Sequence, residues 1–272
     1  MAENLGLYIE NNLIKYAKVS KEKDIVKVEA HGIKFFDNME KAVDQIVRET
    51  FSYKTPISVN ITNEKYTVAN LFKLLNKTDL NKAINTEFEY FCNENTKNKN
   101  AIEYRYLTMP SLQDSDKTRI LYSYVEKANI VEKLQQLDEY KVSTITPISM
   151  AIPNLIKEGD LTNSAIINLE AKTTITILLN GKPYLIETLD DGIEKIINDI
   201  AERENSYSKA YEICKNTTIY TRAGQNLQLE ENEYQDQIMR NIIWCNRKNK
   251  RDHRKKWIRY KKYIYYRNWS CH

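Results

Sequence analysis

The same order of predicted elements occurs twice in this chain. Residues 4–34 alternate apolar and polar positions as three strands with short polar turns, and residues 38–51 carry one helical stripe of apolar side chains. From Asn163 three strands return, with Asn180-Gly181 as a tight turn, and an amphipathic helix is predicted over 190–204. The segments LGLYIENNLIKYAKV and AIINLEAKTTITILL can be laid over one another. A duplicated β-β-β-α unit predicts two similar α/β lobes that face each other across a cleft.

A further block separates the two copies. Residues 66–75 have mixed periodicity and predict a strand only weakly, whereas residues 78–91 predict a helix. The segments AIEYRYLTM and TRILYSYV predict two antiparallel strands, and a helix is expected over residues 126–137. The strand YKVSTIT and a short helix that starts at Pro147 then lead to the second copy.

Glycine is scarce enough to exclude whole classes of protein. The 272 residues contain six glycines, and no two of them lie within three residues of each other. Neither a Walker A loop nor a GxGxxG turn can therefore be formed, which excludes P-loop NTPases and ordinary dinucleotide-binding dehydrogenases. Four scattered cysteines without CxxC spacing indicate reduced thiols that bind no metal. With no signal peptide and no apolar run of membrane-spanning length, we expect a cytoplasmic protein.

Four segments in a fixed order carry a family resemblance. They are LGLYIENNLIK; DLNKAINTEFEYF with IEYRYLTM and RILYSYVEKANIVEKLQQL; TPISMA at 146–151; and AIINLEAKTTITILLNGKPYLIETLDDGIEKI. Over roughly residues 4–217 their order and spacing resemble the actin-like ATPases, and within them the FtsA/PilM branch. The chain looks like a PilM-type protein of type IV pilus assembly, C-terminally truncated or frameshifted.

The resemblance implies the fold class and a set of boundaries. The expected class is α/β: an actin-like (ribonuclease H-like) two-lobed fold with an inserted small α/β subdomain and an incomplete second lobe. The predicted parts are 1–59 for the first part of the first lobe, 60–145 for the inserted subdomain, 146–162 for the return to the first lobe, 163–242 for the incomplete second lobe and 243–272 for a basic aromatic tail.

The two phosphate loops that the resemblance implies depart from the family pattern. The family's aspartate positions are Tyr8 and Asn168 here, and the glycine positions that follow are Glu10 and Glu170. A glutamate brings negative charge and bulk to a site where backbone amides would meet an anion. Two like charges about 4 Å apart repel by roughly 4 kcal/mol at an effective dielectric constant of about 20.

ATP and Mg²⁺ are the cofactors that the resemblance implies, and these loops weaken both expectations. Asn11, Asn12, Lys15, Lys172 and Thr173 remain as phosphate contacts, or else serve only as turn residues and solubilising strand ends. Together with Glu10, Asn168 and Glu170 they are the candidate cofactor-binding residues. The pair Asp190-Asp191 is either a metal pair or a helix N-terminus, and the second interpretation is favoured. The sequence predicts no catalytic residue and no metal ligand.

Three functions are compatible with these sequence features and with the resemblance. The first is a pilus assembly scaffold with little or no ATPase activity, peripheral to the inner face of the cell membrane. By resemblance it would bind the N-terminal peptide of a PilN-like membrane protein in a groove between the inserted subdomain and the first lobe, and would contact the assembly ATPase and the platform protein. The alternative is an ATPase related to FtsA that binds and slowly hydrolyses ATP. The third, least favoured, is binding of nucleic acid or an anionic membrane through the tail.

The tail differs sharply from the rest of the chain. Residues 243–272 hold 11 of the 41 Lys and Arg residues, one of the 37 acidic residues and all three tryptophans. Their net charge is +10, so the other residues sum to −6 and the chain to +4. If the reading frame is shifted so that each codon starts at its present second base, every Trp codon becomes a glycine codon. The shifted frame can then encode a helix, a strand and a glycine turn. We therefore expect this segment to be out of frame and poorly ordered.

Overall fold

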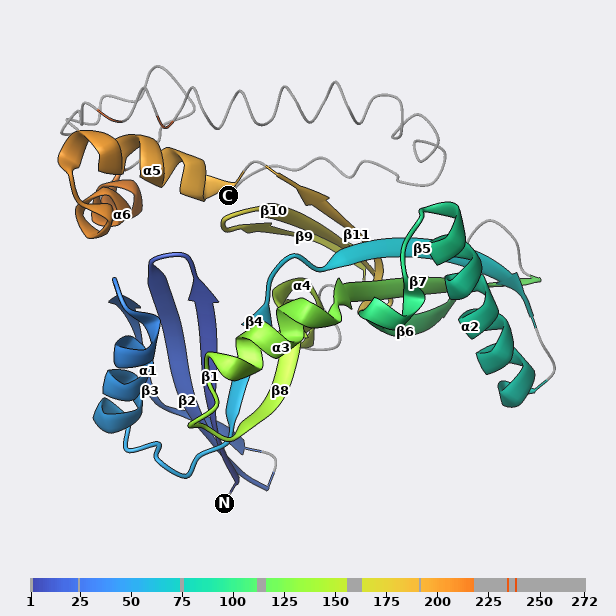
Figure 1. Ribbon diagram of the computed structural model, residues 1–272, viewed down its shortest axis with the longest axis horizontal. Coiled ribbons are helices and arrows are strands. Elements are labelled where there is room, and N and C mark those ends of the chain that lie inside the picture. The colour runs from blue at the N-terminus through green and yellow to red at the C-terminus, as the bar shows by residue number, and fades with distance from the viewer. Residues whose placement is uncertain are drawn as a thin grey trace. The chain divides into compact units, whose positions relative to one another are not determined.

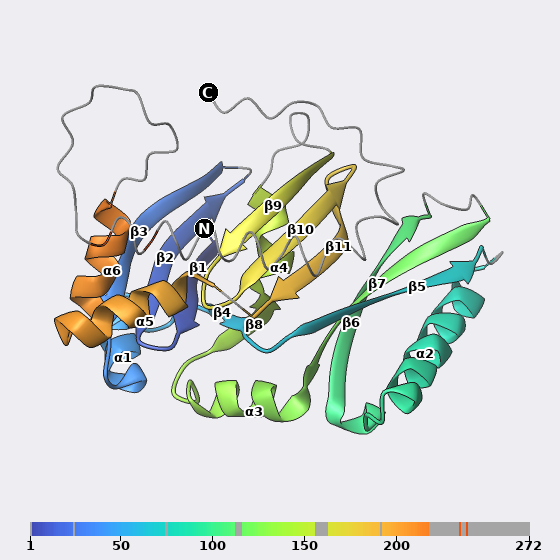
Figure 2. The same ribbon diagram turned by 90° about the horizontal axis from the view of Figure 1, so that it is seen from above.

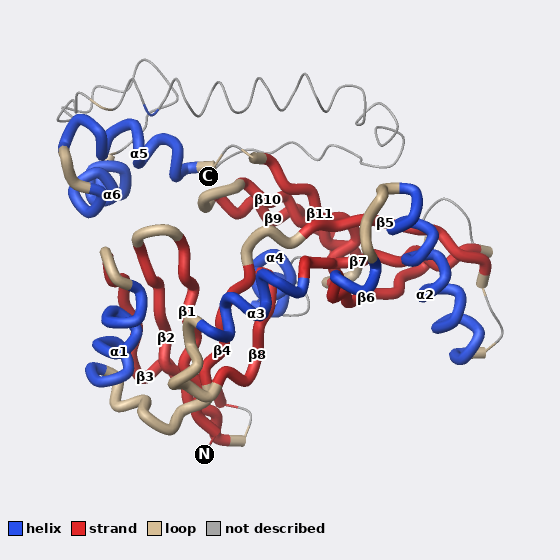
Figure 3. Tube along the Cα trace, viewed as in Figure 1, coloured by secondary structure: helices blue, strands red, loops and turns tan. Residues whose placement is uncertain are grey.

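The computed structural model describes residues 2–23, 25–73, 76–111, 116–155, 163–190 and 192–217, together with Tyr234 and Ile238. The predicted tail at 243–272 lies outside the described residues. Helices and strands are both abundant (Figure 3), so the expected α/β class is confirmed. The chain divides into two compact units, Met1–Asp190 and Asp191–His272, which are described separately below.

The first copy of the repeat belongs to a mixed five-stranded sheet in the first unit, with the order β3-β2-β1-β4-β8. β1, β2 and β3 pair antiparallel as the alternating pattern predicts, and β4 and β8 extend the sheet parallel to β1. The strands are β1 (Ala2–Glu10), β2 (Leu13–Glu22), β3 (Ile25–Phe35), β4 (Ile57–Ile61) and β8 (Val142–Pro147). The first turn lies at Asn11-Asn12 as predicted, but the second is shorter than predicted because β2 continues to Glu22.

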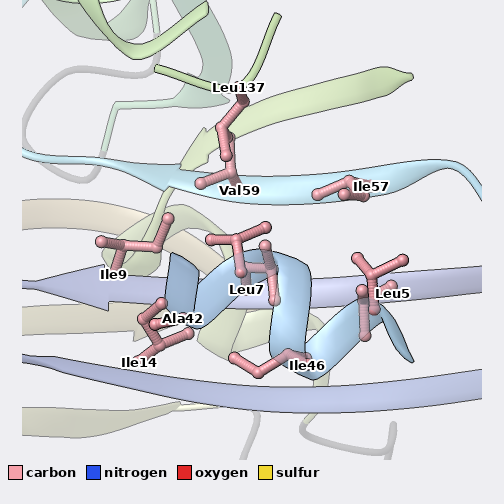
Figure 4. Packing of buried hydrophobic residues seen from close by; sticks show 11 residues of the cluster. Leu5, Leu7, Ile9, Ile14, Ala42, Ile46, Ile57, Val59 and Leu137 are labelled. Atoms are coloured by element: carbon pink, nitrogen blue, oxygen red, sulfur yellow. The ribbon is translucent and has the colours of Figure 1, made fainter. Parts of the chain in front are cut away.

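Helix α1 (Met39–Glu49) covers one face of this sheet. It begins where the sequence predicts, because the Asn38 side chain accepts a hydrogen bond from the Lys41 backbone N–H at 2.9 Å. Its apolar stripe packs on alternate residues of β1 and β4, and Figure 4 shows that core from close by. Its fully buried members include Leu5, Ile14 and Ile46.

The block between the two copies forms a second sheet in the order β5-β7-β6. Its antiparallel strands are β5 (Lys65–Phe72), β6 (Ile102–Pro110) and β7 (Lys117–Glu126), and α2 (Lys77–Glu94) packs on it (Figures 1 and 2). The buried contacts of α2 are Ile84, Phe88 and Cys92. β5 is difficult to predict from the sequence because side chains on both its faces are half-buried. The helix predicted over residues 78–91 continues to Glu94, and the segment after it contains a short 3₁₀ helix, η1 (Lys99–Ala101).

The return to the second copy runs through α3 (Lys127–Gln135), β8, α4 (Ile148–Ala151) and the 3₁₀ helix η2 (Ile152–Leu155). The predicted helix start at Pro147 is one residue early, because Pro147 ends β8 and stands at the N-cap of α4. No helix among the described residues is both long and apolar enough to cross a membrane.

The second copy forms a sheet of its own, in the order β11-β10-β9. Its strands β9 (Asn163–Leu169), β10 (Thr173–Leu179) and β11 (Lys182–Leu189) are antiparallel to their neighbours. Asn180 and Gly181 have φ of 51° and 73°, as a type I′ turn requires. The two copies therefore form separate sheets, as two predicted lobes require. β11 packs on the β5-β7-β6 sheet, where the buried Arg119 donates from Nε to the Tyr184 carbonyl at 3.2 Å.

The second unit contains α5 (Ile193–Glu204) and α6 (Tyr207–Asn216). Their shared core includes Ile196, Ile197, Ile200, Ala210, Tyr234 and Ile238. α5 begins later than the predicted Asp190, with Gly192 at its N-cap and Glu194 in its first turn. Asp190 therefore lies before the helix, and Asp191 is outside the described residues.

Candidate functional site

The candidate site lies at the carboxyl edge of the five-stranded sheet. β1, β4 and β8 are parallel, so the residues at their C-terminal ends meet along one edge. Ligand sites in α/β sheets with parallel strands lie at such edges. The turn after β1 is the first of the two predicted phosphate loops. The turn between β9 and β10 is the second, and the structure brings the two together.

The Glu10 carboxylate joins the two turns. Its Oε1 atom accepts a hydrogen bond from the backbone N–H of Ala171 at 2.7 Å, across 161 residues of sequence. The Tyr8 hydroxyl donates to the same oxygen at 3.1 Å. Burial raises the pKa of Tyr8, and the Glu10 and Glu170 carboxylates raise it further, so the hydroxyl keeps its proton and remains a donor.

A second bridge runs in the opposite direction. The Lys15 ammonium group from β2 donates to both carboxylate oxygens of Glu170, at 2.9 and 2.8 Å. The same ammonium lies 5.4 Å from the centre of the Tyr8 ring. Each turn therefore supplies one carboxylate and one donor to the other turn. The repulsion expected between two glutamates is offset here because each has a donor from the opposite turn.

The remaining predicted contacts are arranged differently. Asn11 and Asn12 are exposed in the first turn, while Asn168 is half-buried in β9 opposite Thr174. The Lys172 ammonium lies 3.4 Å from the Asp190 carboxylate. Thr173 is buried at the start of β10. Of the predicted residues, the structure joins Lys15 and Glu170 directly through their side chains, whereas Glu10 contacts the Ala171 N–H and the Tyr8 hydroxyl. Whether any of the set contacts phosphate stays a prediction.

Asn60 holds the end of β1 in place and was missed by the sequence analysis. Its side chain accepts from the Ile9 N–H at 2.7 Å and donates to the Ile9 carbonyl at 3.1 Å. The regular β1–β4 pairing runs from Leu5 to Leu7, so the buried Asn60 amide continues it by one step. This contact fixes the backbone next to Glu10. A polar residue in the apolar strand PISVNI is the signal that could have found it.

A partly buried polar cluster beside these turns was also missed. The Tyr66 hydroxyl donates to Glu64 Oε1 at 3.2 Å and is hydrogen-bonded to the Ser149 hydroxyl. Burial raises the pKa of Glu64, although Tyr66 and Lys172 both lower it. Burial likewise raises the pKa of Tyr66. Glu64 and Ser149 follow the C-terminal ends of β4 and β8, which is the one sequence signal that could have found them.

The raised pKa of Glu64 predicts how stability varies with pH. At pH values above 4.5, the ordinary pKa of a glutamate side chain, the folded protein holds the Glu64 proton more tightly than the unfolded chain does. The free energy of unfolding should therefore fall as pH rises from 4.5 through the folded pKa. Glu64→Gln should be more stable than wild type at neutral pH, and the two should converge at acidic pH.

Urea unfolding at several pH values tests this prediction. The matched control is Glu49→Gln, because the Lys34 ammonium at 2.8 Å holds the pKa of Glu49 below its usual range. That control should show no gain at neutral pH. Equal pH profiles for wild type and Glu64→Gln would contradict the assignment.

Comparison with solved structures shows what kind of fold positions this site. The chain is similar to a chain of a PilM–PilN type IV pilus biogenesis complex, at 13% identity and a TM-score of 0.67, over 96% of this chain and 78% of the other. The fold is actin-like.

Weaker likenesses accompany this one. The cytoplasmic domain of EpsL, an inner membrane component of the type II secretion system of Vibrio cholerae, gives 11% identity and a TM-score of 0.48, over 74% of this chain and 75% of that one. MreB 5 of Spiroplasma citri bound to AMPPNP gives 7% and 0.39, over 97% and 80%. No protein-family model and no curated protein matches the sequence.

The residues present do not fit the nucleotide that an actin-like fold implies. The Ala171 N–H, which faces the first turn as an anion-binding amide would, is already bound by Glu10. The Lys15 ammonium, a cation that lies between the turns, is bound by both oxygens of Glu170. A triphosphate entering here would meet two carboxylates and would have to displace both bridges.

Proposed function

We propose that this chain is a type IV pilus assembly scaffold of the PilM kind with a degenerate nucleotide site. The observation that carries the proposal is the likeness to a chain of a PilM–PilN complex over 96% of this chain. In the two predicted phosphate turns, Glu10 already binds the Ala171 N–H and Glu170 already binds the Lys15 ammonium. This arrangement supports a binding protein over an ATPase related to FtsA. The partner we propose is the N-terminal cytoplasmic peptide of a PilN-like membrane protein. The scaffold would then be held at the inner face of the cell membrane by that contact, and would meet the assembly ATPase and the platform protein there.

The open edge of β6 offers one place for an extended peptide. β6 is an edge strand of its sheet among the described residues, and an edge strand can add a peptide as a further strand. A hollow of about 490 Å³ lies along it. It is lined by Lys99, Asn100, Ile102, Glu103, Tyr104, Arg105, Tyr106 and Lys127. The exposed Tyr106 ring and the long charged side chains suit a segment with both apolar and polar residues.

Titration with a synthetic PilN-type N-terminal peptide tests the proposal. We expect saturable binding to the full chain by calorimetry, and no heat or turnover with Mg-ATP. A scrambled peptide of the same composition is the control. Absence of peptide binding would contradict the scaffold function, whether or not the protein hydrolyses ATP.

Amide hydrogen exchange then locates the peptide. Pairing at the β6 edge should slow exchange within residues 102–110, because outward N–H groups gain partners. The edge strand β3, at residues 25–35, provides the internal comparison and should not change. Protection of β3 instead of β6 would move the peptide site while leaving the scaffold function in place.

A further inference from the structure

The two turns at the candidate site are joined as a ligand would join them, yet every joining atom belongs to this chain. A main-chain N–H in a tight turn is a binding group for anions. In this protein the anion on the Ala171 N–H is the Glu10 carboxylate, at 2.7 Å. Hydrogen bonds to an ionised acceptor are about twice as strong as neutral ones.

The second bridge makes the arrangement reciprocal. Lys15 from the first turn region holds Glu170 of the second, while Ala171 of the second holds Glu10 of the first. The Lys15 and Glu170 side chains are 32% and 20% exposed, so solvent screens this pair only in part. The Tyr8 hydroxyl donates to Glu10 from the same strand, and this bond limits the rotamers open to that carboxylate.

We propose that Glu10 is a built-in replacement for a nucleotide phosphate, and that Glu10 and the Lys15–Glu170 pair hold the two turns together without any ligand. The inference rests on the proposed scaffold function and adds the regulation of its nucleotide site. A nucleotide-dependent protein of this fold would couple the two turns only when a ligand is bound. This chain couples them permanently, so its partner binding should not respond to nucleotide.

Hydrogen exchange at the β9–β10 turn tests the inference on the full chain. In Glu10→Ala the Ala171 amide loses its acceptor, and its exchange rate should rise at least tenfold, the factor that corresponds to about 1.4 kcal/mol. Lys15→Met keeps Glu10 and leaves Glu170 without its cation, so exchange across the turn should rise by a smaller factor, about two to five. Glu49→Ala, which breaks the ion pair between α1 and Lys34 of β3, is the matched control and should change nothing at this turn.

Two results would overturn the inference. The first is fast exchange at Ala171 in wild type that Glu10→Ala leaves unchanged. The second is slower exchange at this turn when 1 mM Mg-ATP or inorganic pyrophosphate is added to wild type. Should Glu10→Ala fail to fold, Lys15→Met and the ligand additions to wild type still decide the matter. Because no peptide is used, failure here is separate from failure of the scaffold function.

Discussion

Replacement of Phe88 by alanine should lower the free energy of unfolding by about 3–5 kcal/mol, the range for large aromatic truncations in a core. Phe88 is fully buried on the inner face of α2. Its ring is stacked on Tyr104 with centroids 4.0 Å apart, and the Tyr122 ring lies at 5.2 Å. Alanine would leave a cavity that these rigid rings, held by strands β6 and β7, cannot fill.

Urea denaturation followed by far-UV circular dichroism measures this loss. The matched control is Tyr90→Ala, an aromatic truncation on the same helix at a position that is 57% exposed. It should stay within about 0.5 kcal/mol of wild type, as surface substitutions do. Equal losses for the two variants would show that α2 does not pack on its sheet through Phe88.

The local elements were predictable where one periodicity dominates. Within β1 the buried residues Leu5, Leu7 and Ile9 alternate with half-buried ones, and α1 has one apolar stripe with Asn38 at its start. β5 was not predictable with the same certainty, because its side chains are half-buried on both faces and no period stands out. Turn chemistry was informative at Asn180-Gly181, where both residues take the positive φ that the sequence predicts.

The candidate site was predictable in place but not in detail. Glu10 and Glu170 could be nominated as departures at two turns, since each turn is a local pattern. Their contacts with Ala171 and Lys15 could not, because these bonds join the first copy of the repeat to the second and depend on how two sheets pack. Charge arithmetic alone predicts repulsion between the glutamates. The structure shows the donors that compensate it.

Asn60 connects the fold to the site, since its side chain extends the β1–β4 ladder to the residue before Glu10. Asn60→Leu keeps nearly the same volume but removes both hydrogen bonds to Ile9. It would leave a buried N–H and a buried C=O without partners, and each such group costs about 1–3 kcal/mol. We therefore expect the free energy of unfolding to fall by about 2–6 kcal/mol.

The same variant should also loosen the site. With Ile9 released, the Glu10 carboxylate loses its fixed position, so exchange at the Ala171 amide should rise together with the loss of stability. The matched control is Asn70→Leu, a substitution of an exposed asparagine in β5, which should change unfolding by less than about 0.5 kcal/mol. If Asn60→Leu is as stable as wild type and Ala171 exchange stays slow, the end of β1 is held by its own strand pairing rather than by the Asn60 amide.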